Sequence, residues 1–138
     1  MRHYLVVANQ TLGGAHLLEA VQERVRAGDC AFHVVVPASH PHGTAVWTEG
    51  EAKSHAGDQL EAAMRRFREV GAQVTGEVGD ASPVAAANDA LLEGEFDEII
   101  VSTLPLGVSR WLRQDVVHRI QRAHSMPVIH IEAVHEPA

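Results

Sequence analysis

The 138-residue sequence has few cysteines and basic residues and no long apolar run, and each of these absences excludes a class of protein. It contains one cysteine, Cys30, which excludes an internal disulfide, and we expect a cytoplasmic location. It has no apolar run near the roughly 20 residues that span a bilayer, so no membrane association is expected. Its 11 basic residues are Lys53 and scattered arginines in a chain of net charge −7, which argues against a nucleic-acid partner.

Several motifs for binding phosphate or metal are missing as well. Gly13 and Gly14 are only a pair, so the dinucleotide fingerprint G-x-G-x-x-G is absent, and so is the G-x-x-x-x-G-K-[ST] loop. A magnesium-dependent receiver domain needs acidic residues where its strands end, whereas the first expected strand ends in neutral Asn9. His40, His42 and His55 lack a nearby cysteine or spaced carboxylate, so we interpret them as solvated histidines without a metal.

The segment 107–111 (G-V-S-R-W) is partly similar to the nucleophile elbow G-x-S-x-G of serine hydrolases, with His118 and His124 as candidate bases. The second glycine of the elbow is missing, however. Pro105 also separates Ser109 from the preceding strand, where a sharp strand-to-helix turn would be needed. We therefore interpret Ser109 as a cap of a turn or helix, and we predict no catalytic residue.

The sequence does contain short apolar runs that alternate with amphipathic segments. Strands are expected at 4–8, 31–36, 73–78, 98–102 and 127–131, and helices at 15–27, 58–70, from 83 onward and 115–123, with a long loop at 39–57. In the third helix, Ser82 is expected to be the cap and Pro83 the first residue. This alternation predicts one α/β domain, 1–138, with a doubly wound five-stranded parallel sheet of order 3-2-1-4-5 and helices on both faces. A ligand crevice is expected where the first and fourth strands end, because the winding reverses there.

The same segments resemble the universal stress protein family, from Tyr4 to about Ile131. The similarity is carried by Y-L-V-V-A-N, F-H-V-V-V, G-E-V-G-D-A-S-P-V-A-A-A-N-D-A, F-D-E-I-I-V-S-T and S-M-P-V-I-H-I. The resemblance implies this fold, a stress-response or regulatory role, and ATP or AMP as the candidate nucleotide.

In nucleotide-binding members of that family, an aspartate ends the first strand, a valine lies in the second strand, and the loop G-x2-G-x9-G-[ST] follows the fourth. By position, Asn9 replaces the aspartate and Val34 keeps the valine, whereas 102–116 lacks the glycines of the loop and has Asp115 near its end. The residues that the crevice would offer to a ligand are Ala8, Asn9, Val34, Ser102, Thr103, Gly107, Ser109, Arg110, Arg113, Gln114 and Asp115.

Asp115 begins the last expected helix. We expect its carboxylate to cap the first N–H groups and to place a negative charge where a triphosphate would lie. Two unit charges about 4 Å apart repel by about 4 kcal/mol at an effective dielectric near 20, an effect that Arg110 and Arg113 would partly offset.

We therefore favour a non-enzymatic domain with weakened or lost nucleotide binding. The alternative is a nucleotide or small-ligand binding protein, or a hydrolase, that holds an anionic group in the crevice.

The last expected strand has neither a lysine nor an internal proline to protect it as a sheet edge. We therefore expect a homodimer, which the resemblance also implies. The residues that would pair with the second copy are Val128, Ile129, His130 and Ile131. In the alternative, the tail 132–138 covers this edge and the protein is a monomer.

Overall fold

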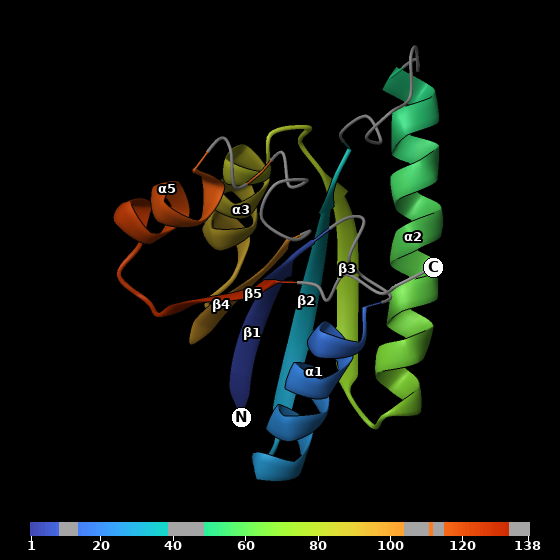
Figure 1. Ribbon diagram of the computed structural model, residues 1–138, viewed down its shortest axis with the longest axis vertical. Coiled ribbons are helices and arrows are strands. Elements are labelled where there is room, and N and C mark those ends of the chain that lie inside the picture. The colour runs from blue at the N-terminus through green and yellow to red at the C-terminus, as the bar shows by residue number, and fades with distance from the viewer. Residues whose placement is uncertain (9–13, 39–48, 104–110, 112–114, 133–138) are drawn as a thin grey trace.

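The computed structural model describes residues 1–8, 14–38, 49–103, 111 and 115–132 of the chain. These residues form strands and helices that alternate along the chain (Figure 1). The strands are β1 (Arg2–Val7), β2 (Cys30–Pro37), β3 (Gln73–Gly79), β4 (Glu98–Thr103) and β5 (Val128–Glu132). The helices are α1 (Ala15–Ala27), α2 (Glu49–Glu69), α3 (Pro83–Glu93) and α5 (Val116–Ala123).

All strand pairs are parallel, and the strand order β3-β2-β1-β4-β5 confirms the predicted doubly wound sheet. The central strand is β1, in which Val6 is paired with Val34 of β2 on one side and with Ile100 of β4 on the other. A strand that is paired on both edges and covered on both faces needs consecutive apolar residues, which is why the run 4–8 is buried throughout. Apart from α2, the predicted ends of the elements agree with the structure to within two residues.

Helices α1 and α2 cover one face of the sheet, and α3 and α5 cover the other (Figure 1). Alternate side chains of each strand point to opposite faces, so β1 contributes to both cores. The first core, beneath α1 and α2, includes Tyr4, Val6, Phe32, Leu60 and Phe67. The second core, beneath α3 and α5, includes Leu5, Val7, Ala86, Ala90 and Ile120.

The long loop predicted at 39–57 is wrong in its second half, because α2 begins at Glu49. The prediction took Gly50 and the polar residues around it as loop signals, but 49–57 forms the first part of a helix of 21 residues. Buried alanines extend the apolar stripe of this helix toward its start, at Ala52, Ala56, Leu60 and Ala63. The first half of the predicted loop lies outside the described residues.

The connection from β3 to α3 follows the sequence closely. The Ser82 hydroxyl accepts a hydrogen bond from the Ala85 N–H at 3.3 Å, and Pro83 is the first helical residue, as predicted. Gly79, at the end of β3, allows α3 to approach, because a Cβ atom there would lie 2.9 Å from the Cβ of Ala86. The start of α3 is thereby fixed against the carboxyl ends of β2 and β3.

Candidate functional site

The predicted crevice lies where β1 and β4 end, because the order of the sheet reverses between them. Val7 is paired with Val101, so the residues that follow, Ala8 and Ser102, lie side by side at this edge. Ala8, Ser102 and Thr103 are 0%, 2% and 2% exposed. The structure therefore brings three of the predicted site residues together, and they contribute hydroxyl and backbone groups but no charge.

The Thr103 hydroxyl is bound to the edge strand of the sheet. Its Oγ1 lies at 2.7 Å from Nε2 of His130 on β5, within hydrogen-bond distance. From the other face of the sheet, Nδ1 of His16 in α1 donates a hydrogen bond of 3.1 Å to the carbonyl oxygen of Glu132. The carboxyl end of β5 is thus held by β4 and by α1 next to the crevice.

The resemblance predicts that Val34 of β2 contributes to nucleotide binding. Its side chain is fully buried in the first core, so it packs between the sheet and the helices. The remaining predicted site residues lie outside the part of the chain that the structure describes. They are Asn9, Gly107, Ser109, Arg110, Arg113 and Gln114.

Asp115 precedes α5, but it does not cap the helix as predicted. Its backbone is left-handed, with φ 57° and ψ 35°, and its side chain accepts no hydrogen bond from the first N–H groups of the helix. Instead, Oδ1 accepts a hydrogen bond of 2.6 Å from Nδ1 of His118, and Oδ2 lies 3.5 Å from Nη2 of Arg122. A side-chain cap needs an extended backbone at the capping residue, and the left-handed conformation turns this carboxylate aside.

The Asp115 cluster is open to solvent. The side chains of Asp115, His118 and Arg122 are 51%, 67% and 69% exposed, so water screens the attraction between them. The carboxylate nevertheless lowers the positive potential that the helix dipole and Arg122 would give to this end of α5. A phosphate group placed there would compete with a carboxylate that is already bound to His118 and Arg122.

The two candidate bases of the hydrolase interpretation have other partners. His118 binds Asp115, and Nε2 of His124 lies 2.7 Å from Oδ1 of Asn88 on α3. Within the described ranges, no group of three or more His, Cys, Asp or Glu side chains is arranged to hold a metal ion. None of the described helices combines the length and apolar character needed to cross a bilayer.

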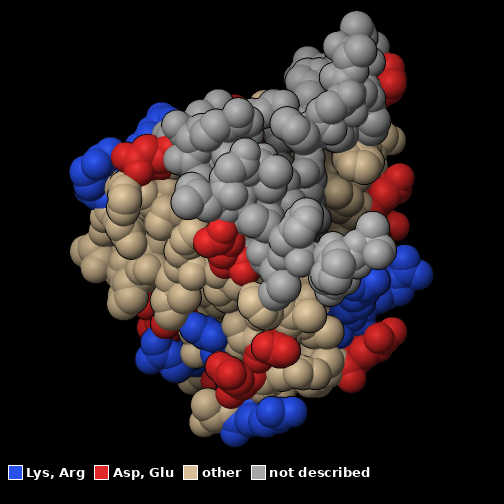
Figure 2. Space-filling view, viewed as in Figure 1, with Lys and Arg blue, Asp and Glu red and all other residues tan. Residues whose placement is uncertain are grey.

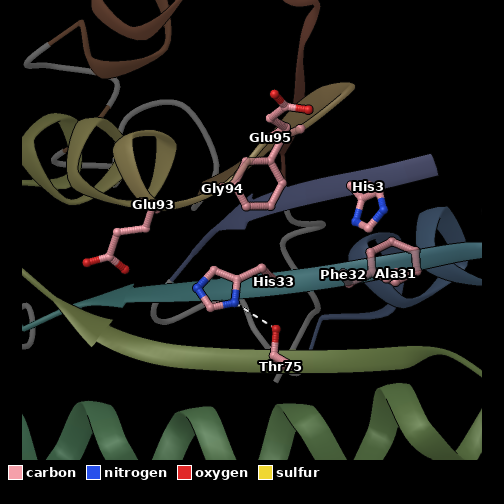
Figure 3. A pocket seen from close by; sticks show the side chains of 10 residues that line it. His3, Ala31, Phe32, His33, Thr75, Glu93, Gly94 and Glu95 are labelled. Atoms are coloured by element: carbon pink, nitrogen blue, oxygen red, sulfur yellow. Dashed lines mark hydrogen bonds between the residues drawn. The ribbon is translucent and has the colours of Figure 1, made fainter. Parts of the chain in front are cut away.

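A groove of about 620 Å³, which was not predicted, lies at the opposite end of the sheet on the α3 face. Figure 3 shows His33 of β2 and Thr75 of β3 on its floor, with Glu93 at the end of α3 above them. Nδ1 of His33 lies 2.7 Å from Oγ1 of Thr75, and Nε2 lies 3.7 Å from Oε1 of Glu77. The sequence did contain a signal for this groove. His33 and Thr75 are polar residues within strands, and they face the same side of the sheet as buried Val35.

No protein-family model matches the chain, and no curated protein matches its sequence. Among solved structures, the chain is similar to the universal stress protein from Archaeoglobus fulgidus, with 18% identity, a TM-score of 0.66, and 95% of this chain and 93% of that one covered. A structure of the universal stress protein from Archaeoglobus fulgidus in complex with dAMP is similar with 19% identity and a TM-score of 0.66, and the match covers 95% of this chain and 97% of that one. A universal stress protein in complex with cAMP is similar with 16% identity and a TM-score of 0.65, and the match covers 96% of this chain and 98% of that one.

These similarities extend over nearly the whole length of both chains, and they show that the protein has the universal stress protein fold. The fold that the sequence resemblance implied is therefore confirmed. Identities of 16% to 19% establish the fold alone, and what those proteins bind does not extend to this chain without further argument.

Proposed function

We propose that the chain is a divergent universal stress protein that acts as a non-enzymatic stress-response or regulatory interaction module, with weakened or lost nucleotide binding. The fold supports the family. The observation that carries the proposal is the Asp115 carboxylate at the start of α5, where it binds His118 and Arg122. A phosphate group favours a helix start with free N–H groups and no resident anion, and this helix start holds an anion.

The expected penalty is smaller than the unscreened repulsion. Two charges about 4 Å apart would repel by about 4 kcal/mol at an effective dielectric near 20. The Asp115 side chain is 51% exposed and already paired, so solvent and its partners remove most of this energy. We expect the carboxylate to weaken the binding of a nucleotide phosphate about tenfold, which corresponds to about 1.4 kcal/mol.

The test is a calorimetric titration of AMP and ATP, with and without Mg²⁺, into the wild type and Asp115→Asn. Asparagine keeps the shape of the side chain and tolerates the left-handed backbone, while it removes the charge. We expect binding to the wild type in the millimolar range or weaker, and about tenfold tighter binding to the variant. Asp58→Asn, an exposed change of equal charge on α2, serves as the control and should leave the affinity unaltered.

Micromolar binding of ATP by the wild type would contradict the proposal and favour the second candidate, a nucleotide or small-ligand binding protein or a hydrolase. This candidate is supported by the buried hydroxyls of Ser102 and Thr103 at the ends of the strands, and by two proteins of the same fold that were solved with dAMP and cAMP. Release of phosphate or of nucleoside monophosphate during the same titration would separate a hydrolase from a binding protein.

The proposed module is a homodimer that pairs through β5. In support, β5 is an edge of the sheet, and Val128, Ile129 and Ile131 are only partly buried in the single chain. Sedimentation equilibrium tests this: Ile129→Lys should be a monomer, whereas the wild type and Gln73→Lys, a matched change on the opposite edge, should be dimers. A monomeric wild type would overturn the proposal.

We also propose that the protein acts in the cytoplasm. Cys30 is a buried free thiol, and the cytoplasm keeps thiols reduced. Fractionation of cells that produce the untagged protein should recover it with the cytoplasmic proteins, and recovery in the exported fraction would contradict this location.

A further inference from the structure

Two neighbouring grooves flank the connection between α3 and β4. Their volumes are about 620 and 760 Å³, and residues of this connection line both. Because the connection leads into the amino end of β4, the grooves lie at the end of the sheet opposite to the crevice. We call this region the α3–β4 surface and define it by His3, Leu92, Glu93, Glu95, Phe96 and Asp97.

Exposed apolar side chains concentrate at this surface. Among the described residues, the large hydrophobic side chains that are exposed are Leu92, at 86%, and Met1, at 63%. Both line the larger groove, together with Leu91, Phe96 and Met126. Apolar side chains that gather at one groove, instead of being scattered singly, are typical of a protein interaction site.

The rim of the same surface is acidic. Glu93, Glu95 and Asp97 are exposed, and no lysine or arginine occurs among the described residues that line the two grooves. Arg2 is close in sequence: its Nε donates a hydrogen bond of 3.2 Å to the Tyr4 hydroxyl, and its positive charge also interacts with Asp97, which leaves Glu93 and Glu95 as the carboxylates for a partner. Figure 2 shows acidic and basic described side chains intermingled over the face in view, whereas the carboxylates of Glu93, Glu95 and Asp97 gather at the rim of the two grooves.

The connection is held firmly against β1. The His3 N–H donates a hydrogen bond of 2.7 Å to Oδ2 of Asp97, and the Asp97 N–H donates one of 2.7 Å to the His3 carbonyl oxygen. Phe96 is half-buried and packs against the second core. A surface that is fixed before binding loses little conformational entropy when a partner arrives.

We propose that the α3–β4 surface binds a basic, leucine-containing segment of a partner protein. A leucine of the segment fills the groove beside Leu92, and its lysine or arginine side chains pair with Glu93 and Glu95. A second copy of this chain is a poor occupant, because a symmetric contact would bring the same carboxylates together. The inference rests on the proposed role as an interaction module and adds the class of its partner.

The test measures fluorescence anisotropy of a labelled 14-residue synthetic peptide with leucines at helical spacing and lysines between them. The combined change Glu93→Lys with Glu95→Lys should weaken binding at least about tenfold, because attraction becomes repulsion. The matched change Glu61→Lys with Glu69→Lys alters the total charge equally on α2, at the other face of the sheet, and should weaken binding less than about twofold. Leu92→Ser should weaken binding without any change of charge.

Equal weakening by the two double variants would overturn the proposal, because it would mean unspecific attraction to an acidic protein. Equal affinity for a peptide with glutamate in place of lysine, or no binding by the wild type at millimolar peptide, would overturn it too. So would self-association that Leu92→Ser abolishes, since the occupant would then be a second copy. Changes in amide NMR shifts upon peptide addition should gather at 88–97 and at His3. The nucleotide titration of Asp115→Asn does not involve this surface, so the two proposals can fail separately.

Discussion

The two faces of the sheet differ in how far their helices cover β2 and β3. With 21 residues, α2 extends about 32 Å, whereas the 11 residues of α3 extend only about 16 Å. Under α2, Phe32 and Phe67 pack edge to face with their ring centres 6.0 Å apart. On the other face, α3 ends above the middle of the strands, and His33 and Thr75 line a groove. The length of the covering helix therefore decides which part of the sheet is core and which part is available as a binding surface.

Removal of a large side chain from the sheet face under α2 should lower the stability of the protein the most. Phe67→Ala should lower the free energy of unfolding by about 3 to 5 kcal/mol, because the Phe67 side chain is fully buried in the first core. Leu92→Ala, at the exposed end of α3, should change it by less than about 0.5 kcal/mol. Urea unfolding followed by circular dichroism measures both, and similar losses would contradict the difference between the faces.

Glycines at the two faces test how closely each helix packs. In Gly79→Ala the new Cβ would lie 2.9 Å from Cβ of Ala86 and 3.0 Å from Cγ1 of Val35, so α3 itself must shift. We expect a loss of about 2 to 3 kcal/mol in unfolding free energy. In Gly76→Ala the closest atom, at 2.6 Å, is the flexible end of Leu60, whereas the backbone oxygen of Val34 is farther away at 3.1 Å, so a smaller loss of about 1 to 2 kcal/mol is expected. The same urea experiment would contradict this order if Gly76→Ala were the more damaging change.

One substitution within α2 should stabilise the protein. No atom lies within 4 Å of a Cβ added at Gly57, which is helical in the structure. Gly57→Ala should therefore raise the free energy of unfolding by up to about 1 kcal/mol, because alanine favours the helix. An unchanged or lower midpoint in urea would show that 49–57 does not form the first part of α2.

The thiol of Cys30 in the first core should make the stability weakly dependent on pH. Burial, and then the charge of Asp29, raises the pKa of Cys30. The folded protein thus holds the thiol proton more tightly than the unfolded chain, so the stability contribution is complete below the ordinary thiol pKa and is lost as the pH rises above it. Between about pH 8 and 10 the wild type should lose more unfolding free energy than Cys30→Ala. Parallel curves for the two proteins would contradict this expectation.

Much of the fold could be predicted, because apolar runs and helical stripes are local signals. The strands were recognised from runs such as 4–8, and the start of α3 from Ser82 and Pro83. The first part of α2 was missed because its stripe there consists of the small residues Ala52 and Ala56, which contrast little with their surroundings.

The candidate site could be predicted only in part. The carboxyl ends of β1 and β4 follow from strand order, which places Ala8 and Ser102 correctly. The conformation of Asp115 does not, because a left-handed backbone at an aspartate depends on the connection around it and leaves no sequence pattern. The α3–β4 surface was missed because it results from the short span of α3 over the sheet, a relation between distant segments.

The position of β1 at the centre of the sheet also affects how the chain assembles. The first three strands, β1 to β3, lie within residues 2–79 and can pair before the rest of the chain folds. The other edge of β1 can pair only when β4 is present. The contact that closes this seam is the ladder between 4–7 and 98–101, which joins residues 94 positions apart. Until that contact forms, an apolar strand edge stays unpaired, so slow closure would limit the folding rate and leave newly made chains prone to aggregation.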